Sequence, residues 1–494
     1  MTEPPGPADT AVPEAEEKPR LSFIERMRRI FDGTSDAIEL LPEQEPRELS
    51  APVRVAWSTG PFRLTLGKST MEFHPDPPAD DRKRGGQRDW IVHPGDEFYQ
   101  SLTGFLRICP GDNVIFGRDD DVQTAVFDYP KSVARRHLEI TNRNGELTLK
   151  PLDPDRFCAI SFLPESDAPQ KLAEKRRRNL ERLTALLGHP FETFEHDNAL
   201  ERITRVNRIL ADEAFRERDA DGNPGGIVSL PDGLTPLIVG DIHTRIDNLL
   251  KVVVEGGFVD ALERNEACLV LLGDLVHSQE SGELEKMDSS ILILDTFLLL
   301  KERFPANVFY IRGNHESFSP DVGKGGVAQG VLLRKHLKKA RGKAFLAEVE
   351  TLFEQLPFVV QNRHFVACHG APTRSDITRE TLVNIQRYSG IQHEIVWNRV
   401  RQGNRPGGYT KGSVKRFRRT LGLPKHAPVI VAHTPLSDED TVWLDVTEIT
   451  GHHVVYSAHL HLVGAMTLIG NTAVPLEYTA EPIVSEAEPE EVSN

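Results

Sequence analysis

The C-terminal half of the chain contains three short apolar runs that each end abruptly in polar residues. Residues 236–239 precede Gly-Asp-Ile-His243, residues 268–272 precede Gly-Asp274, and residues 308–311 precede Arg-Gly-Asn-His315. Short apolar runs bounded by turn residues are typical of buried strands. In an open α/β sheet, ligands bind beyond the carboxyl ends of the strands. The pattern therefore predicts three strands whose ends meet at one site.

The residues at these strand ends are typical metal ligands. Asp241 and His243 are two residues apart, so on an extended segment both side chains would face one ion, with Asp274 as a second carboxylate. Asn314 offers an amide oxygen, and His369 and His433 each follow a further apolar run. They predict a second ion that shares Asp274. Carboxylate, imidazole and amide together suit Mn, Fe or Zn better than Ca or Mg.

The motifs GDIH, GDLV, GNHE, HG and AHTP, in this order, resemble the calcineurin-like metallophosphoesterases, specifically their phosphoprotein phosphatase branch. The resemblance covers roughly residues 230–480. It implies two metal sites and a water-derived hydroxide, bridging the metals, that attacks phosphorus. It also implies that His315 is the general acid that protonates the leaving oxygen. The implied metal ligands are Asp241, His243 and Asp274 for the first site and Asp274, Asn314, His369 and His433 for the second.

The chain departs from the family pattern GDxVDRG. His277 stands where the family has an acid that orients the catalytic histidine, and Ser278 stands where it has a phosphate-binding arginine. His277 is therefore a candidate active-site group, although an acid from residues 280–288 is an alternative partner for His315. The segment 404–409 resembles the family's N-x-R-G motif, which makes Arg405 the candidate phosphate ligand. A surface role remains open, since Arg399, Arg401 and Arg416 lie close in sequence.

A second alternative concerns the last metal ligand. The run ending in His459 resembles the loop that follows this ligand and predicts His459 at the rim of the site. His459 and His461 could instead supply the His-x-His pair that other metallophosphoesterases use. His433 is preferred, because it follows a buried-strand run and precedes Thr-Pro.

Residues 51–165 carry short alternating runs separated by turn residues, which predicts an all-β sandwich. Gly-Arg118 and, further on, Ala134-Arg135-Arg136-His137 resemble the forkhead-associated (FHA) domain, whose pattern is Gly-Arg followed by Ser-Arg-x-His. The resemblance implies that Arg118 and Arg135 bind a phosphothreonine of a partner. Ala134 replaces the serine, and residues 153–161 lack the family's Asn-Gly pair. A sandwich that serves only as a docking surface is the alternative.

The remaining segments are read from composition and periodicity. Residues 1–20 are rich in Pro, Glu and Ala and predict a disordered tail. Residues 21–50 predict an amphipathic helix and linker. Residues 166–229 predict a helical linker, whose basic run 175–178 is expected to be a solvated helix face. The metallophosphoesterase domain is expected over 230–482, followed by an acidic tail over 483–494.

Composition restricts location and partners. A net charge of −15 over 494 residues argues against nucleic-acid binding. The four cysteines lack CxxC spacing, which favours a reducing compartment. The sequence shows neither an apolar stretch of about 18 residues nor the apolar core of a secretory signal. We therefore expect a cytoplasmic protein with no membrane partner.

Taken together, the sequence predicts an α+β protein: an FHA-like sandwich, a helical linker, and a metallophosphatase built as a central β-sandwich flanked by helices. The predicted function is hydrolysis of phosphate monoesters, with phosphoserine and phosphothreonine in proteins as substrates and a phosphothreonine-containing partner for the FHA-like domain. Two alternatives remain open. One is a hydrolase of nucleotides such as diadenosine tetraphosphate, and the other is a catalytically weak, metal-loaded scaffold, which the missing arginine favours.

Overall fold

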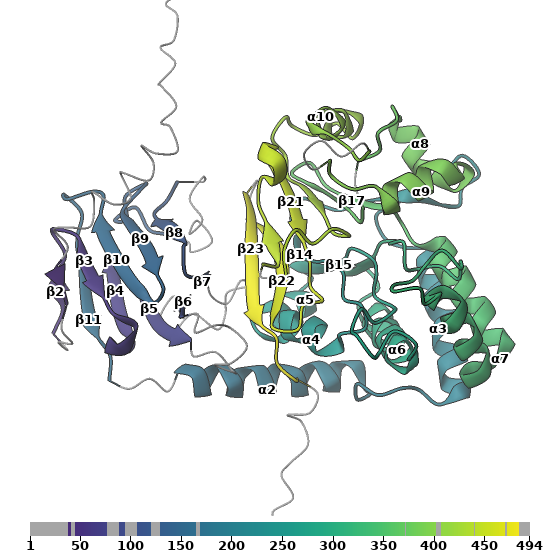
Figure 1. The fold of residues 1–494 in the computed structure, drawn as a ribbon, viewed down its shortest axis with the longest axis horizontal. Helices are drawn as coiled ribbons and strands as arrows, with labels where there is room; N and C mark the ends of the chain where they lie inside the picture. The colour runs from purple at the N-terminus through teal and green to yellow at the C-terminus, as the bar shows by residue number, and fades with distance from the viewer. Residues whose placement is uncertain are drawn as a thin grey trace, which may run out of the picture.

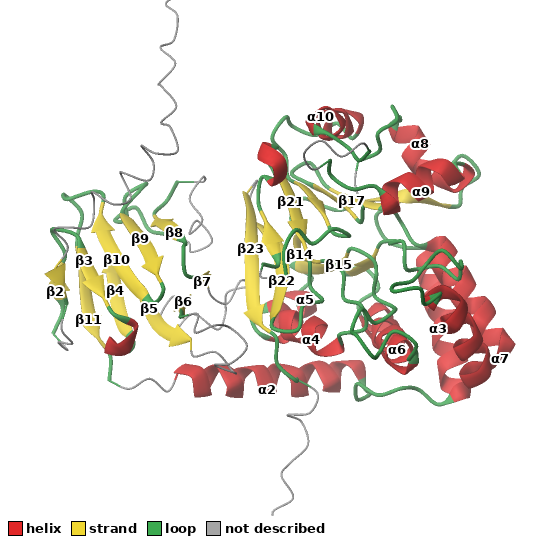
Figure 2. Ribbon diagram, viewed as in Figure 1, coloured by secondary structure: helices red, strands yellow, loops and turns green. Residues whose placement is uncertain are grey.

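The computed structural model describes residues 38–40, 45–76, 88–93, 106–119, 129–164, 168–370, 372–401, 407–438, 440–469 and 472–483. Figure 1 shows a β-rich N-terminal part joined by helix α2 to a larger part that contains both helices and sheets. Figure 2 separates the two kinds of element by colour. The tail predicted for residues 1–20, residues 21–37 of the predicted helix and linker, and residues 484–494 lie outside the described residues.

The N-terminal part consists of two sheets that share one core. Their strand orders are β1-β3-β10-β9-β8 and β2-β11-β4-β5-β6-β7. Side chains along strand β4 alternate between the core and the solvent. Phe62, Leu64 and Leu66 face the core, whereas Arg63 is exposed. The strands are β1 (Ile38–Glu39), β2 (Arg47–Glu48), β3 (Val53–Val55), β4 (Phe62–Leu66), β5 (Ser69–Asp76), β6 (Asp89–His93), β7 (Leu106–Ile108), β8 (Asn113–Phe116), β9 (Leu138–Arg143), β10 (Glu146–Pro151) and β11 (Cys158–Phe162).

Two strands of these sheets lie before the predicted boundary at residue 51. Strand β1 pairs with β3, and β2 pairs with β11. The prediction of a helix and linker over residues 21–50 is therefore wrong for residues 38–39 and 47–48. These strands have only two residues each, too few to show an alternating pattern, and they form because neighbouring strands offer free hydrogen-bonding edges.

Helices α2 (Ala168–Leu187) and α3 (His196–Ala211) connect the two parts. They pack on the larger part: Leu183 of α2 and Val206 of α3 are fully buried in its main hydrophobic core. The basic run does not form one solvated face. Arg176 is buried and donates to Glu255 at 2.9 Å and to Glu481 as well, whereas Arg177 and Arg178 are exposed.

The larger part contains two stacked sheets with helices on both outer faces. One sheet has the order β16-β15-β14-β22-β23, and the other has the order β12-β13-β17-β18-β19-β21-β20. Ile238 and Val270 of the first sheet pack against Val360 and Ile430 of the second. The strands are β12 (Arg216–Arg218), β13 (Pro224–Ser229), β14 (Thr235–Val239), β15 (Ala267–Leu271), β16 (Val308–Tyr310), β17 (Val359–Gln361), β18 (Val366–Cys368), β19 (Val429–Val431), β20 (Val442–Trp443), β21 (His452–Val455), β22 (Leu462–Ile469) and β23 (Thr472–Thr479).

The helices divide between the two outer faces. Helices α4 (Ile246–Val254), α5 (Phe258–Glu263), α6 (Asp288–Arg303) and α7 (Gln329–Gln355) share a core with the first sheet. Helices α8 (Arg379–Val383), α9 (Ser389–Trp397) and α10 (Lys411–Thr420) cover the second. This arrangement is the β-sandwich flanked by helices that the sequence predicts. The linker boundary at residue 229 is wrong, however, because β12 and β13 already belong to the second sheet.

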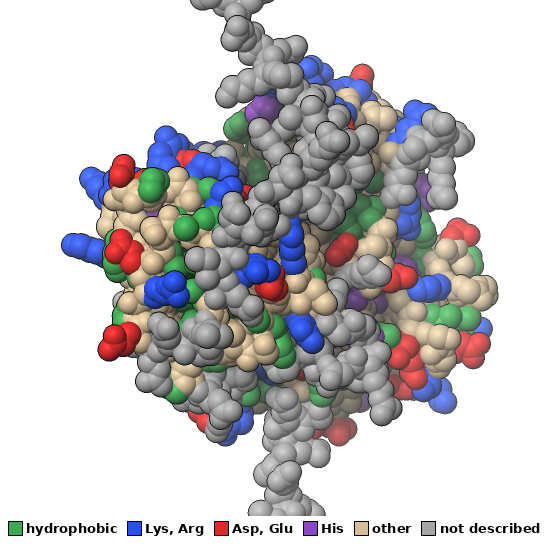
Figure 3. Space-filling model, turned by 60° about the vertical axis from the view of Figure 1, so that its left-hand side comes forward, with side chains coloured by type: hydrophobic (Ala, Val, Ile, Leu, Met, Phe, Trp, Pro, Cys, Tyr) green, Lys and Arg blue, Asp and Glu red, His purple; other side chains and the backbone are tan. Residues whose placement is uncertain are grey.

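None of the described helices combines the length and the apolar character needed to cross a membrane. On the face of the molecule shown in Figure 3, Lys and Arg side chains lie interspersed with Asp and Glu side chains.

Candidate metal centre

The first two predicted ligands lie where strand β14 ends. Strands β14, β15 and β16 are parallel neighbours, so their carboxyl ends lie at one edge of the sheet. Gly240 is required there, because a Cβ at this position would lie 2.2 Å from the carbonyl oxygen of Val455. Asp241 and His243 both face the site, with 3.8 Å between Asp241 Oδ2 and His243 Nε2. They do so because His243 adopts a left-handed conformation (φ 45°), not the extended one expected from the sequence.

The second loop places Asp274 at the centre of the site. Gly273 and Asp274 both have positive φ, which turns the chain sharply after β15. The backbone N–H of His315 donates to Asp274 Oδ1 at 2.9 Å, so the third loop is tied directly to the carboxylate. Gly313 permits this approach, because a Cβ there would lie 2.3 Å from Asp274 Oδ1.

Glu316 fixes the second and third loops to each other. Its fully buried carboxylate accepts hydrogen bonds from the backbone N–H groups of Gly313, Asp274 and Leu275, at 2.8, 2.9 and 3.1 Å. This role of Glu316 was not predicted from the sequence. The sequence feature that could have indicated it is a glutamate directly after Gly-Asn-His, in a segment that must be buried.

The second sheet supplies two more ligands. His369 follows β18 and His433 follows β19, and these strands are parallel neighbours. The Nε2 atom of His369 lies 3.0 Å from Asn314 Oδ1, 3.2 Å from His433 Nδ1 and 3.4 Å from Asp274 Oδ2. The backbone N–H of His433 donates to Asp241 Oδ1 at 3.1 Å, which connects the ends of the two sheets.

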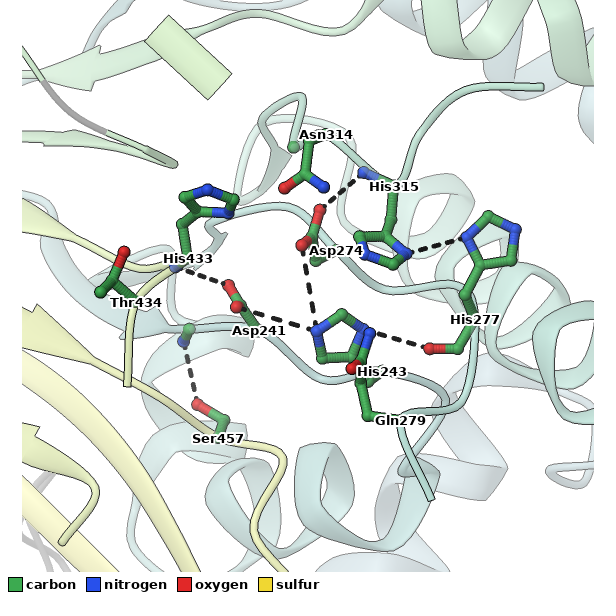
Figure 4. Close-up of polar contacts among 12 residues, drawn as sticks. Asp241, His243, Asp274, His277, Gln279, Asn314, His315, His433, Thr434 and Ser457 are labelled. Atoms are coloured by element: carbon green, nitrogen blue, oxygen red, sulfur yellow. Dashed lines mark hydrogen bonds and ion pairs between the residues drawn. The ribbon is translucent and has the colours of Figure 1, made fainter. Parts of the chain in front are cut away.

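All six predicted metal ligands therefore meet at one buried place. Figure 4 shows Asp241, His243, Asp274 and His433 pointing toward one another, with Asp241 and His243 on one loop and Asp274 and His433 on two others. Two groups of potential ligand atoms lie within 4.8 Å of one another: His243, Asp274 and His315, and Asp274, His369 and His433. Asp274 belongs to both groups, which is the shared carboxylate expected from the sequence.

The chemistry of this centre fits divalent metal ions. Asp241 and Asp274 are each 2% exposed, so two carboxylates lie in one buried site. Burial raises the pKa of Asp241 to about 7, and the His369 ring opposes this shift while the Asp274 charge adds to it. The buried Nε2 of His433 has no hydrogen-bond partner among the described residues. Buried carboxylates, imidazoles and an amide oxygen form a ligand set for divalent transition metals, which would balance the buried negative charge.

Comparison with known protein families agrees with this geometry. Residues 234–463 match the family model described as calcineurin-like phosphoesterase. This segment is a calcineurin-like metallophosphoesterase domain. Enzymes of this kind use divalent metals, and all six ligands lie inside the matched residues.

Proteins that resemble parts of the chain include the following phosphatases. It is 28% identical over 179 residues to the serine/threonine-protein phosphatase PP2A-like PPG1 of Candida albicans, covering 35% of this chain and 38% of that relative. A protein serine/threonine phosphatase from Saccharomyces cerevisiae, with similarity to human PP5, aligns with a TM-score of 0.44 at 16% identity, over 60% of this chain and 92% of that chain. A cold-active protein-tyrosine phosphatase of a psychrophilic Shewanella aligns with a TM-score of 0.33 at 12% identity, over 51% and 83%.

His315 contacts His277 at the edge of the metallophosphoesterase centre. The two Nδ1 atoms are 3.0 Å apart, so one ring donates to the other. Three of the four acids of segment 280–288 have other partners, since Glu280 pairs with Arg245, Glu283 with Lys286 and Asp288 with His336, and the fourth, Glu285, is exposed. His277, and not an acid of this segment, is therefore the residue that contacts the predicted general acid.

Arg399 is a cation at this centre that the sequence analysis left as a surface residue. Its Nη1 donates to the carbonyl oxygen of the metal ligand His433 at 3.0 Å and to Thr434 Oγ1 at 3.1 Å. It also lines a surface cavity of about 490 Å³ together with Trp397 and Asn398. Arg405, the predicted phosphate ligand, lies outside the described residues. The feature that could have indicated Arg399 is its position directly after Trp397-Asn398, where helix α9 ends and a loop begins.

The alternative ligand pair His459 and His461 is not supported. His459 Nε2 contacts the carbonyl oxygen of Asp440 at 3.0 Å, and its ring packs against Tyr456 with 4.7 Å between centroids. The Tyr456 ring in turn lies 6.3 Å from that of His243. His459 therefore packs on Tyr456, which lies beside the predicted metal ligand His243. This position agrees with the predicted place of His459 at the rim of the site.

The two arginines of the FHA-like motif lie on loops that are tied together. The backbone N–H of Arg118 donates to Ala134 O at 3.1 Å, and Arg118 Nε donates to Val133 O at 2.6 Å. Gly117 lets the loops approach, because a Cβ there would lie 2.1 Å from Arg135 O. The Arg135 side chain is 78% exposed and pairs with Asp119. His137 is fully buried, and its Nδ1 accepts from Ala134 N at 3.0 Å.

Proposed function

We propose that the metallophosphoesterase domain hydrolyses phosphate monoesters, with phosphoserine and phosphothreonine in proteins as its substrate class. The observation that carries the proposal is the convergence of Asp241, His243, Asp274, Asn314, His369 and His433, with His315 beside them. The serine/threonine specificity named for the Candida albicans relative supports this substrate class. Because the chain spans only 38% of that relative's length, the substrate class remains our proposal.

The chain's own residues suggest how such a reaction would proceed. Two divalent ions held by the six ligands would activate water and neutralise charge on the phosphoryl group. Arg399, anchored on the carbonyl oxygen of His433, is placed to bind phosphoryl oxygens. Since Nδ1 of His315 contacts His277, its Nε2 is left to protonate the leaving serine or threonine oxygen. An alkoxide is a poor leaving group, so this protonation is an essential part of the reaction.

A substrate panel tests the proposal. The full chain, loaded with Mn²⁺, is assayed on phosphoserine and phosphothreonine peptides, on p-nitrophenyl phosphate and on diadenosine tetraphosphate. We expect the highest kcat/KM on phosphopeptides, and loss of that activity in His315→Ala. A higher kcat/KM on the nucleotide would replace our proposal by the nucleotide-hydrolase alternative. Absence of hydrolysis on every substrate would support the scaffold alternative, which Ser278 favours.

For the N-terminal sheets, we propose an FHA-like role in docking a phosphothreonine of a partner. Support comes from Arg118 and Arg135, which lie on two adjoining loops next to the buried His137. Exposed guanidinium groups on such loops can form charge-assisted hydrogen bonds to phosphate. Ala134 removes one hydroxyl donor, so we expect weaker binding than with a serine there.

A phosphothreonine-peptide array separates specific recognition from nonspecific docking. We expect phosphorylation-dependent binding that Arg118→Ala abolishes and that Arg63→Ala, on strand β4 of the same sheets, leaves unchanged. Binding that ignores phosphorylation, or that survives Arg118→Ala, would leave only a docking surface without phosphate recognition.

A further inference from the structure

Ser278 supplies no cation to its side of the metal centre. Its hydroxyl accepts from the backbone N–H of Glu280 at 3.2 Å, and its carbonyl oxygen accepts from Gln329 Nε2 at 2.8 Å. Ser278 thus has a structural role in the 273–280 loop and cannot contribute a positive charge. Arg399 contacts the opposite end of the centre, at His433. A phosphoryl group carries charge on several oxygens, so a guanidinium on only one side would leave some of them unpaired.

Arg245 comes to this side from a different loop. It follows the metal ligand His243 by two residues, and both His243 and Thr244 have positive φ (45° and 69°). This sharp turn lets the backbone N–H of Thr244 donate to Leu275 O at 2.7 Å, which holds the segment against the 273–280 loop. The guanidinium of Arg245 then reaches Glu280 Oε2 at 3.1 Å, two residues beyond Ser278.

The backbone of Arg245 belongs to the turn that carries the predicted metal ligand His243. Its N–H donates to Ile242 O at 3.0 Å, and it follows His243 by two residues. Because its guanidinium pairs with Glu280 of the 273–280 loop, Arg245 lies at the rim of the centre, on the side of His243.

The contact between Arg245 and Glu280 is one that a phosphate can replace. The Arg245 side chain is 24% exposed and that of Glu280 is 45% exposed. An ion pair this accessible to water contributes little to stability, because solvent screens it. A doubly charged phosphoryl group offers a guanidinium shorter and stronger hydrogen bonds. Exchange of Glu280 for phosphate is thus favourable, and only a surface side chain has to move.

We propose that Arg245 binds a phosphoryl oxygen of the substrate and supplies the cation that Ser278 does not, giving up its contact with Glu280 when phosphate binds. The inference rests on the proposed phosphatase function, but it concerns phosphate binding and not turnover. It assigns the second phosphate-binding cation to the loop after Asp241-Ile242-His243 in place of the loop after Asp274.

Orthophosphate binding to the Mn²⁺-loaded full chain, measured by calorimetry, tests the proposal together with KM for p-nitrophenyl phosphate. Arg245→Ala should weaken orthophosphate binding at least tenfold and raise KM to a similar degree. Ser278→Arg in that background should restore both. Arg264→Ala removes an equal charge from an exposed position and should change neither. Glu280→Gln should tighten orthophosphate binding, because the guanidinium loses its competing partner.

Binding by Arg245→Ala within twofold of wild type would overturn the inference, as would unchanged or weaker binding by Glu280→Gln. The Glu280 variant keeps the test decisive if Arg245→Ala does not fold. Failure of the proposed function is distinguishable. Orthophosphate binding that depends on Arg245, without hydrolysis of any ester, would remove the phosphatase activity and keep the phosphate site. Ester hydrolysis that is insensitive to Arg245→Ala would keep the phosphatase activity and remove Arg245 from the phosphate site.

Discussion

The Nδ1 atoms of His277 and His315 lie 3.0 Å apart, so the predicted general acid is held by a second histidine. His277 is itself rigidly placed. Its backbone N–H donates to Ser290 Oγ at 3.1 Å, and its carbonyl oxygen contacts Nδ1 of the metal ligand His243, also at 3.1 Å. His277 therefore orients one ring through its side chain and another through its backbone.

Replacement of His277 tests its positioning role. We expect His277→Ala to lower kcat by about ten- to a hundredfold with KM changed little, because the His315 ring loses its partner while the phosphate-binding groups remain. His277→Asp supplies the carboxylate that the family pattern has at this position and should restore kcat. Equal losses in both variants, or a loss confined to KM, would contradict a role through His315.

Arg399 and Arg405 can be distinguished by the same kinetics. Arg399→Ala should raise KM for p-nitrophenyl phosphate about tenfold or more, since a charge-assisted contact to phosphate is lost. Arg264→Ala is the control, because Arg264 is an exposed arginine that pairs with Glu266 and does not line the cavity of Arg399. If Arg405→Ala raises KM while Arg399→Ala does not, the candidate taken from the sequence motif is the correct one.

The sequence predicted the convergence of the strand-end side chains, because each follows an apolar run that is short enough to be a buried strand. It also predicted the central place of Asp274, which belongs to both groups of potential ligand atoms. Their role as metal ligands stays a prediction. The conformation expected for His243 was wrong, since left-handed backbone at a non-glycine residue depends on tertiary contacts such as the hydrogen bond from His243 N to Asp274 O. Arg245 and Arg399 were missed as site residues for the same reason. Nothing in their local sequence shows which loop a long side chain will reach.

Glu316 provides a stability prediction. Its carboxylate accepts hydrogen bonds from three buried backbone N–H groups. Each buried donor left without a partner lowers the free energy of unfolding by about 1–3 kcal/mol. We expect Glu316→Ala to lower the free energy of unfolding by roughly 3 kcal/mol or more. Glu316→Gln keeps one acceptor oxygen and should lose less. Denaturant unfolding measures the free energy of unfolding of both variants. A Glu316→Ala variant as stable as wild type would contradict a stabilising role for the three hydrogen bonds to this carboxylate.

His452 provides a prediction about pH. Its ring contacts Val429 O through Nδ1 at 3.2 Å and Tyr409 Oη through Nε2 at 2.9 Å, an arrangement that suits neutral imidazole. Burial lowers its pKa to about 3. The unfolded chain, with a pKa of about 6.5, therefore binds one more proton between these values, and stability falls as pH drops below about 6.5.

Comparison with His452→Phe isolates this contribution. Between pH 7.5 and 5, wild type should lose about 2 kcal/mol more unfolding free energy than the variant, since one pKa unit corresponds to about 1.4 kcal/mol. Denaturant unfolding at both pH values, with the metal concentration held constant, gives the difference. Identical losses in the two proteins would show that His452 does not titrate as expected.

The central claim is that six side chains from five loops hold two divalent ions that hydrolysis requires. Its most direct test measures bound metal and p-nitrophenyl phosphate hydrolysis on one preparation, stripped with chelator and then reconstituted with Mn²⁺. We predict about two ions per chain in reconstituted wild type, with activity that is lost on stripping and regained on reconstitution. In Asp274→Asn, fewer ions and an activity at least about a thousandfold lower are expected, because both ligand groups contain Asp274. Hydrolysis that persists in the stripped protein, or Asp274→Asn with wild-type metal content and activity, would contradict the claim.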